Sequence, residues 1–196
     1  MKILLLADRE CPFLWDYYRP GMFGDYDLIL SSGDLKSDYL SFIVTMARSP
    51  LLYVHGNHDG GYERRPPEGC DCVEDRLYVW KGLRILGLGG SMKYNGGPHQ
   101  YTERQMAWRI KKLNFKIARA GGVDIVLTHA PAAGYGDLID PAHRGFQCFV
   151  ELIDRWKPKY FIHSHVHFNY ARNIARELQR GDTKIINAFE RYEIEL

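Results

Sequence analysis

Short apolar runs alternate with a helical pattern in the first sixty residues of the chain. Residues 2–7 and 27–32 are almost continuously hydrophobic and are followed by polar residues, as buried strands are. Residues 38–47 instead repeat apolar side chains every three to four positions, which is typical of one buried helix face. Residues 51–56 form the next apolar run. Strands that alternate with helices predict an α/β fold.

The rest of the chain continues this alternation. Thr102 and Gln105 have the spacing of a capping box, and Gly121 and Gly122 end the helix that it predicts. The same patterns predict a helix around 149–156 and strands at 77–80, 84–90, 124–129, 159–164, 183–188 and 191–196. No repeat or linker interrupts the chain, so we expect one domain over residues 1–196.

Composition excludes several classes of protein. With 45% hydrophobic and 26% charged residues among 196, the chain can bury a core and is not disordered by composition. It shows no signal peptide, no membrane span and no disulfide framework for its four cysteines, so we expect a reducing cytoplasmic location and no membrane partner. A net charge of +2 does not favour a nucleic-acid partner. The charge is uneven: residues 1–60 hold 5 Lys/Arg against 8 Asp/Glu, and residues 61–128 hold 12 against 7.

Polar side chains follow five of the predicted strands. One such residue is typical of a turn or cap, but the carboxyl ends of strands in α/β sheets form the ligand-binding face. Five successive strand ends with carboxylate, amide or imidazole groups therefore favour a metal site for Mn, Fe, Zn or Mg. The residues are Asp8, Glu10, Asp34, Asn57, His58, Asp59, His129, His165 and His167.

Three histidines, His163, His165 and His167, occupy every second position near the end of this series. If the strand geometry continued, all three side chains would point to one side. Such histidines cluster when a cation holds them together. His163 comes before the pair and is more typical of the core or of a supporting position. We also interpret three others as hydrogen-bonded structural groups: His55, His99 and His143.

In chain order, Asp8-x-Glu10, Gly33-Asp34, Gly56-Asn57-His58-Asp59, His129 and His165-x-His167 resemble the calcineurin-like metallophosphoesterase superfamily. The segments HAPAAGYGD (129–137) and HRGF (143–146) resemble a compact phosphodiesterase subgroup within it. The resemblance implies two packed mixed β-sheets flanked by helices, a four-layer sandwich. It also implies two divalent ions at the strand ends, with Mn favoured over Fe, Mg or Zn.

The resemblance further implies a role for each residue. His58 would contact the substrate and stabilise the transition state or protonate the leaving group, and Asp38 would orient it. A hydroxide that bridges the two ions would attack a phosphodiester. The implied ligands are Asp34 to both ions, Asp8 and His167 to the first ion, and Asn57, His129 and His165 to the second.

Two positions depart from the family pattern. Glu10 stands where the family has histidine, and Ser164 stands where it has glycine. Glu10 can ligate the first ion and add a negative charge, or it can turn away to pair with a neighbour. Ser164 costs backbone freedom only if φ is positive there.

Several functions remain open at this point. The segment GDLKSDY (33–39) lacks the arginine with which related phosphatases hold a monoester, so we expect a small phosphodiester as substrate. Arg64 and Arg65 are more typical of a solvated loop than of a substrate-binding site. The alternative to an enzyme is a protein-binding scaffold of the same fold with an impaired metal site. The sequence does not predict an oligomeric state.

Overall fold

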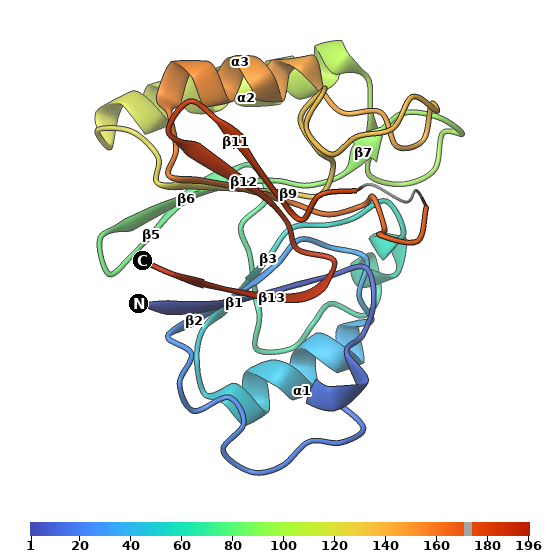
Figure 1. Ribbon diagram of the computed structural model, residues 1–196, viewed down its shortest axis with the longest axis vertical. Coiled ribbons are helices and arrows are strands. Elements are labelled where there is room, and N and C mark those ends of the chain that lie inside the picture. Colours follow the sequence, from blue (N-terminus) through green and yellow to red (C-terminus); the bar gives the residue numbers. More distant parts are fainter. Residues whose placement is uncertain (171–173) are drawn as a thin grey trace.

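The computed structural model describes residues 1–170 and 174–196, which form four layers (Figure 1). Two β-sheets lie face to face in the middle. Helix α1 (Ser37–Ala47) covers the outer face of the first sheet, and α2 (Glu103–Arg119) and α3 (Gln147–Trp156) cover the outer face of the second. This arrangement confirms the α/β four-layer architecture that the resemblance implied.

The first sheet carries three of the five strand ends with polar residues. Its strands β1 to β4 run parallel, so their carboxyl ends lie at one edge, and β13 pairs antiparallel with β1. The spatial order is β13 (Glu190–Glu195), β1 (Lys2–Ala7), β2 (Leu28–Ser31), β3 (Leu51–Tyr53) and β4 (Asp71–Cys72).

The second sheet supplies the other two strand ends. Its four central strands are parallel, and both edge strands are antiparallel to their neighbours. The order is β11 (Glu177–Arg180), β12 (Thr183–Asn187), β10 (Tyr160–His163), β9 (Ile125–Thr128), β6 (Leu83–Leu88) and β5 (Arg76–Trp80). Shorter elements are β7 (Ser91–Met92), β8 (Gln100–Tyr101) and the 3₁₀ turns η1 (Pro12–Leu14) and η2 (Asp59–Glu63).

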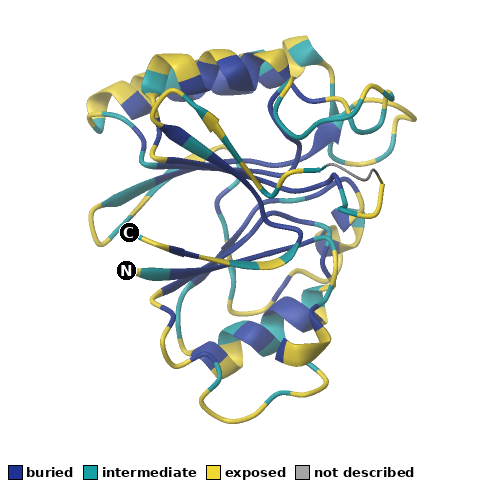
Figure 2. Ribbon diagram, in the orientation of Figure 1, coloured by how far each residue is buried: buried dark blue, intermediate teal, exposed yellow. Residues whose placement is uncertain are grey.

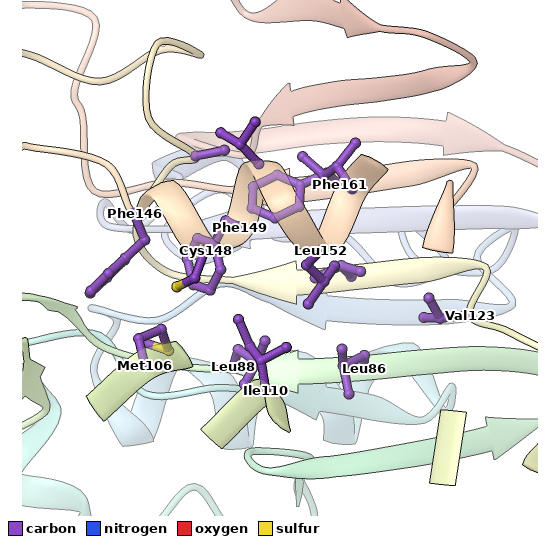
Figure 3. Packing of buried hydrophobic residues seen from close by; sticks show 14 of the residues in the cluster. Leu86, Leu88, Met106, Ile110, Val123, Phe146, Cys148, Phe149, Leu152 and Phe161 are labelled. Carbon is purple, nitrogen blue, oxygen red and sulfur yellow. The ribbon is translucent and has the colours of Figure 1, made fainter. Parts of the chain in front are cut away.

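Apolar side chains pack on both faces of each sheet, and Figure 2 shows that the central strands are largely buried. Leu5 and Leu30 from the first sheet belong to one buried cluster with Ile162 from the second. Outside the second sheet, Met106 of α2 and Phe149 of α3 belong to another (Figure 3). Both faces are buried, which explains why the strands read as continuous apolar runs rather than alternating ones.

The helix signals of the sequence are present in the structure. Thr102 and Gln105 form both hydrogen bonds of the capping box at the start of α2. The Glu103 carboxylate also accepts the backbone N–H groups of Gln147 and Cys148, at 3.1 and 2.7 Å, so the same turn caps α3. Among the residues that the structure describes, no helix is long and apolar enough to cross a membrane.

Candidate metal centre

The carboxyl ends of strands from both sheets meet at one place in the fold. Asp8 follows β1, Asp34 follows β2, and His165 follows β10. All three have left-handed backbone, with φ of 61°, 57° and 66°. Non-glycine residues seldom adopt this conformation, and it persists where the surrounding structure demands it. Here all three left-handed residues lie in the loops that follow the strands, at the carboxyl edge of the two sheets.

Four donor atoms from four different loops converge, and one of them is Nε2 of His129, which is completely buried. Its Nε2 atom lies 3.0 Å from Oδ1 of Asn57 and 3.1 Å from Nδ1 of His165. Oδ2 of Asp34 lies 3.3 Å from the same nitrogen. The structure thus brings together Asp34, Asn57, His129 and His165, as the resemblance implied for the second ion and the bridging position.

Outer hydrogen bonds fix which nitrogen of each histidine faces this group. Nδ1 of His129 donates to the carbonyl of Ser32 at 2.8 Å, and Nε2 of His165 donates to the carbonyl of Ala142 at 2.8 Å. Their other nitrogens then present lone pairs towards each other and towards two acceptor oxygens. Such an arrangement is repulsive unless a cation or a proton lies between the atoms, and its oxygen and nitrogen donors suit a divalent ion.

The electrostatics of the metal-free chain lead to the same conclusion. Burial favours the neutral forms of both Asp34 and His129, but the attraction between their charges outweighs it. The pKa of Asp34 is lowered to about 2 and that of His129 is raised to about 9. A proton on Nε2 of His129 therefore occupies the position that an ion would take.

Asp8 and His167 lie beside this group. The Asp8 side chain is fully buried, and both of its oxygens accept the backbone N–H of His165 at 3.2 Å. Burial raises the pKa of Asp8 to about 7, with the nearby Asp34 carboxylate contributing. Nε2 of His167 lies 3.8 Å from Oδ1 of Asp8, and its ring stacks on Tyr170. This pair can contribute ligands to a first ion.

Glu10 adopts the alternative orientation that the sequence left open. Its carboxylate pairs with the ammonium of Lys36 at 3.2 Å. It is not among the residues that line the cavity at the ligand group. Ligation by Glu10 therefore remains a prediction, and it would require this carboxylate to exchange Lys36 for the ion.

A cavity of about 330 Å³ opens onto the ligand group, and His58 lines it. The backbone N–H of His58 donates to Oδ1 of Asp34 at 2.7 Å, which holds the histidine beside the ligands. A neighbouring hollow of about 430 Å³ shares Asp34 and His58 with this cavity and also contains Asp38. Asp38 pairs there with Arg65 at 2.8 Å, and within the described ranges it has no hydrogen bond to His58.

The cavity has aromatic and imidazole walls that the sequence did not assign to the site. Tyr94, His143 and Tyr170 all line it. We interpreted His143 as a structural group, and Nδ1 of its ring does bond Asp140 at 2.9 Å. The ring nevertheless packs against His165, with centroids 5.0 Å apart. The HRGF segment was the available signal, whereas Tyr94 reaches the site from a loop that carries no motif.

His163 does not join the other two histidines. Strand β10 ends at His163, and the left-handed backbone of His165 breaks the alternation that would have aligned all three. The His163 ring is buried near Phe161, and burial lowers its pKa to about 4. Ser164 is not among the described residues with positive φ, so no glycine is needed there. Its Oγ lies 3.1 Å from Nδ1 of His129 and supports that ring.

A second group of possible ligands, His55, Glu74 and His99, lies outside this centre. The rings of His55 and His99 are stacked, with centroids 4.4 Å apart and planes only 9° apart. One ion cannot lie in the plane of both rings in this arrangement. Glu74 is already paired with His55 and Arg109, each at 2.7 Å. We interpret this group as an ion-pair network that ties α2 to the loop after β3.

Comparison with known proteins finds relatives of low sequence identity. It is 27% identical over 149 residues to the UPF0046 protein T07D4.2 of Caenorhabditis elegans, covering 74% of this chain and 35% of that protein. It is 23% identical over 197 residues to the UPF0046 protein K07C11.7 of the same organism, covering 84% and 62%. The chain thus spans less than two thirds of the length of both relatives.

A solved structure and a family model complete the comparison. The structure of TT1561 of Thermus thermophilus superimposes with a TM-score of 0.60 at 16% identity, covering 96% of this chain and 89% of that one, which shows a shared fold. The calcineurin-like phosphoesterase family model matches residues 13–169, a range that contains Asp34, Asn57 and every histidine of the centre. The chain therefore belongs to the calcineurin-like phosphoesterase family.

Proposed function

We propose that this chain is a metal-dependent phosphodiesterase with two divalent ions, Mn in preference to Fe, Mg or Zn. One observation carries the proposal: Nε2 of His129 faces a carboxylate, an amide oxygen and a second imidazole nitrogen, next to a cavity that His58 lines. Ions held there would supply Lewis acidity to a phosphoryl group and make a water molecule nucleophilic.

In the proposed reaction, the chain's own residues orient the substrate and move protons. His58 is solvent-exposed and its backbone is fixed by Asp34, so its ring can reach a phosphoryl oxygen in the cavity. There it would donate a proton to the leaving oxygen or stabilise the developing charge. Ser32 and Ala142 hold the two buried imidazoles in the tautomers that ligation needs.

The cations near His58 support a diester rather than a monoester as substrate. Arg65 is paired with Asp38, and Lys36 is paired with Glu10. Both cations are thus already neutralised by carboxylates, and little positive charge is left for the extra negative charge of a monoester. We propose a small phosphodiester, handled in the cytoplasm, where the four free thiols of the chain would stay reduced.

The position of Glu10 supports the alternative that the chain is a protein-binding scaffold. A carboxylate held by Lys36 leaves the first ion with fewer ligands, as a scaffold with an impaired metal site would have. The complete group around His129 favours the enzyme, because a scaffold has no need of converging oxygen and nitrogen donors that suit a divalent ion.

Hydrolysis of model substrates tests the proposal. The metal-depleted chain is assayed with bis(p-nitrophenyl) phosphate and with p-nitrophenyl phosphate, with and without added Mn²⁺. We expect Mn-dependent hydrolysis that favours the diester and is abolished by chelator. Mn-dependent hydrolysis that favours the monoester would contradict the diester assignment, and no Mn-dependent hydrolysis of either substrate would favour the scaffold.

A further inference from the structure

The outer face of α2 carries two exposed aromatic side chains. Trp108 is 56% exposed and Phe115 is 74% exposed. Seven residues correspond to almost two turns, so at 3.6 residues per turn these side chains point in directions only about 20° apart. The buried side of the same helix is formed by Met106, Ile110, Leu113 and Ile117. Trp108 and Phe115 therefore project directly away from the core.

Exposed cations surround these two aromatics. We call the set the α2 outer face: Arg104, Trp108, Lys111, Lys112, Phe115 and Arg119. It extends over about 22 Å at 1.5 Å per residue and contains no acidic residue. It belongs to the segment in which basic residues outnumber acidic ones, 12 to 7.

The four cations of this face lack the carboxylate partner that some other surface cations of the described residues have. Lys2, Arg84 and Arg180 each pair with a carboxylate. In the part of the chain that the structure describes, the salt bridges include none from Arg104, Lys111, Lys112 or Arg119. A solvated helix face would explain unpaired cations, but it would not explain two large aromatics at its centre.

A hollow of about 500 Å³ adjoins Trp108. Lys93 and Arg104 line it, together with Tyr101, so it presents further positive charge beside an aromatic wall. Arg109 also borders it, but that side chain is engaged by Glu74 and Asp75. The hollow has the size and charge to accept a phosphate-bearing headgroup.

We propose that the α2 outer face docks this protein on a membrane surface that contains anionic phospholipids. Trp and Phe are favoured at the boundary between headgroups and acyl chains, and flanking Lys and Arg side chains are attracted to anionic lipids. This contact lies in the plane of the membrane and needs no spanning segment. The net charge of the whole chain gives no sign of this face, because acidic residues elsewhere in the chain offset the cations of the face.

Two other occupants fit the face less well. A second copy of this chain would bring the same four unpaired cations against each other, which is repulsive. Single-stranded nucleic acid binds by stacking bases on open aromatic rings. Nζ of Lys112 lies 3.3 Å from the centroid of the Trp108 ring and covers one side of it. A continuous anionic surface satisfies all four cations and both aromatics together.

Co-sedimentation with vesicles tests the proposal. The full chain is mixed with vesicles of phosphatidylcholine alone or of phosphatidylcholine with phosphatidylserine. We expect binding only to the second kind. Binding should weaken as NaCl rises from about 0.1 M to about 1 M, which shortens the screening length from about 10 Å to about 3 Å. The double variant Trp108→Ala/Phe115→Ala should bind at least about tenfold more weakly.

Matched variants distinguish binding through this face from non-specific adsorption to vesicles. Phe13 is 53% exposed and lies in η1, outside the α2 outer face, so Phe13→Ala should bind vesicles as the wild type does. Lys111→Glu/Lys112→Glu should lose the preference for phosphatidylserine. Each variant changes exposed residues only, and unchanged hydrolysis of a soluble diester checks that it is folded.

Three results would overturn the proposal. Failure of the wild-type protein to bind vesicles that contain phosphatidylserine would overturn it directly. Vesicle binding that the double variant retains would place the contact elsewhere. The third result is a wild-type protein that does not bind vesicles but binds a fluorescent oligothymidine or self-associates in sedimentation velocity. If the double variant loses oligothymidine binding, the face binds nucleic acid. If it loses self-association, the face binds a second copy of the chain.

Discussion

Nε2 of His129 lies 3.1 Å from Nδ1 of His165, and each ring donates its other nitrogen's proton to a backbone carbonyl. Two imidazole lone pairs therefore face each other across a buried gap that also holds oxygens of Asn57 and Asp34. Such a pair is unfavourable between two neutral rings, and it becomes favourable around a metal ion or, in the metal-free chain, around the proton on His129. This relationship accounts for the clustering of histidines at the strand ends.

The first prediction concerns His58. Replacing it with alanine should lower the rate of diester hydrolysis by about 10²–10⁴-fold, which is the usual contribution of a positioned general acid. The metal content should stay at the wild-type level, because His58 contributes no atom to the group around His129. Turnover and bound Mn are measured on the same sample. A parallel loss of Mn would make His58 a ligand instead.

The second prediction concerns Gly56. A Cβ atom there would overlap Oδ1 of Asp34, so Gly56→Ala must displace the carboxylate that faces His129. We expect Mn²⁺ affinity to fall by about 10–100-fold, as it does when support of a ligand is lost. Gly61 lies in the nearby 3₁₀ turn η2 with no atom within 4 Å of its Cβ position, so Gly61→Ala is the control. Equal affinities for Mn²⁺ in the two variants would refute this role.

The third prediction concerns the metal-free chain. The pKa of His129 is raised from its ordinary 6.5 to about 9, because attraction to Asp34 outweighs burial. Its charge therefore stabilises the fold fully below pH 6.5, and this contribution is lost as the pH rises through about 9. Asp8, whose pKa burial raises to about 7, acts in the same direction at lower pH.

Bound ions should replace the proton on His129. The melting temperature of the chelated protein should thus fall between about pH 6.5 and 9, and that of the Mn-loaded protein should fall less. His55, whose pKa is raised to about 10, affects both forms alike, so the difference between them isolates the centre. Equal pH dependence in the two forms would show that no ion displaces this proton.

The fourth prediction concerns Glu10. Because its carboxylate is paired with Lys36, we expect Glu10→Gln to bind the same number of Mn ions as the wild type. Lys36→Met releases the carboxylate and should tighten binding of the first ion if Glu10 then reaches it. The stoichiometry is measured by metal analysis after reconstitution. One Mn fewer in Glu10→Gln would establish Glu10 as a ligand in the loaded protein.

The strand ends could be predicted from the sequence because two signals occur together there, an apolar run and the polar residue that follows it. Continuous apolar runs identify buried parallel strands, and the polar residue after each run lies at the shared carboxyl edge of the sheet. Asp34 and His129 were assigned to one site in this way, although 95 residues separate them. The capping box at Thr102 is similarly local, since its partner lies three residues away.

Other features depend on contacts that no local pattern records. Lys36 meets Glu10 only because β1 and β2 are neighbours. The alternation of His163, His165 and His167 suggested a common face, but the strand ends at the first of them. Strand β11 was missed because edge pairing, rather than an apolar pattern, defines it.

The most direct test of the account is the position of bound Mn²⁺ in a crystal of the protein, read from anomalous diffraction. We predict a peak within bonding distance of Oδ2 of Asp34, Oδ1 of Asn57, Nε2 of His129 and Nδ1 of His165. The His163→Gln protein, in which only a buried ring outside the group changes, should show the same peak. No peak among these four atoms in Mn-soaked crystals, with His129 still bonded directly to Asp34, would contradict the account.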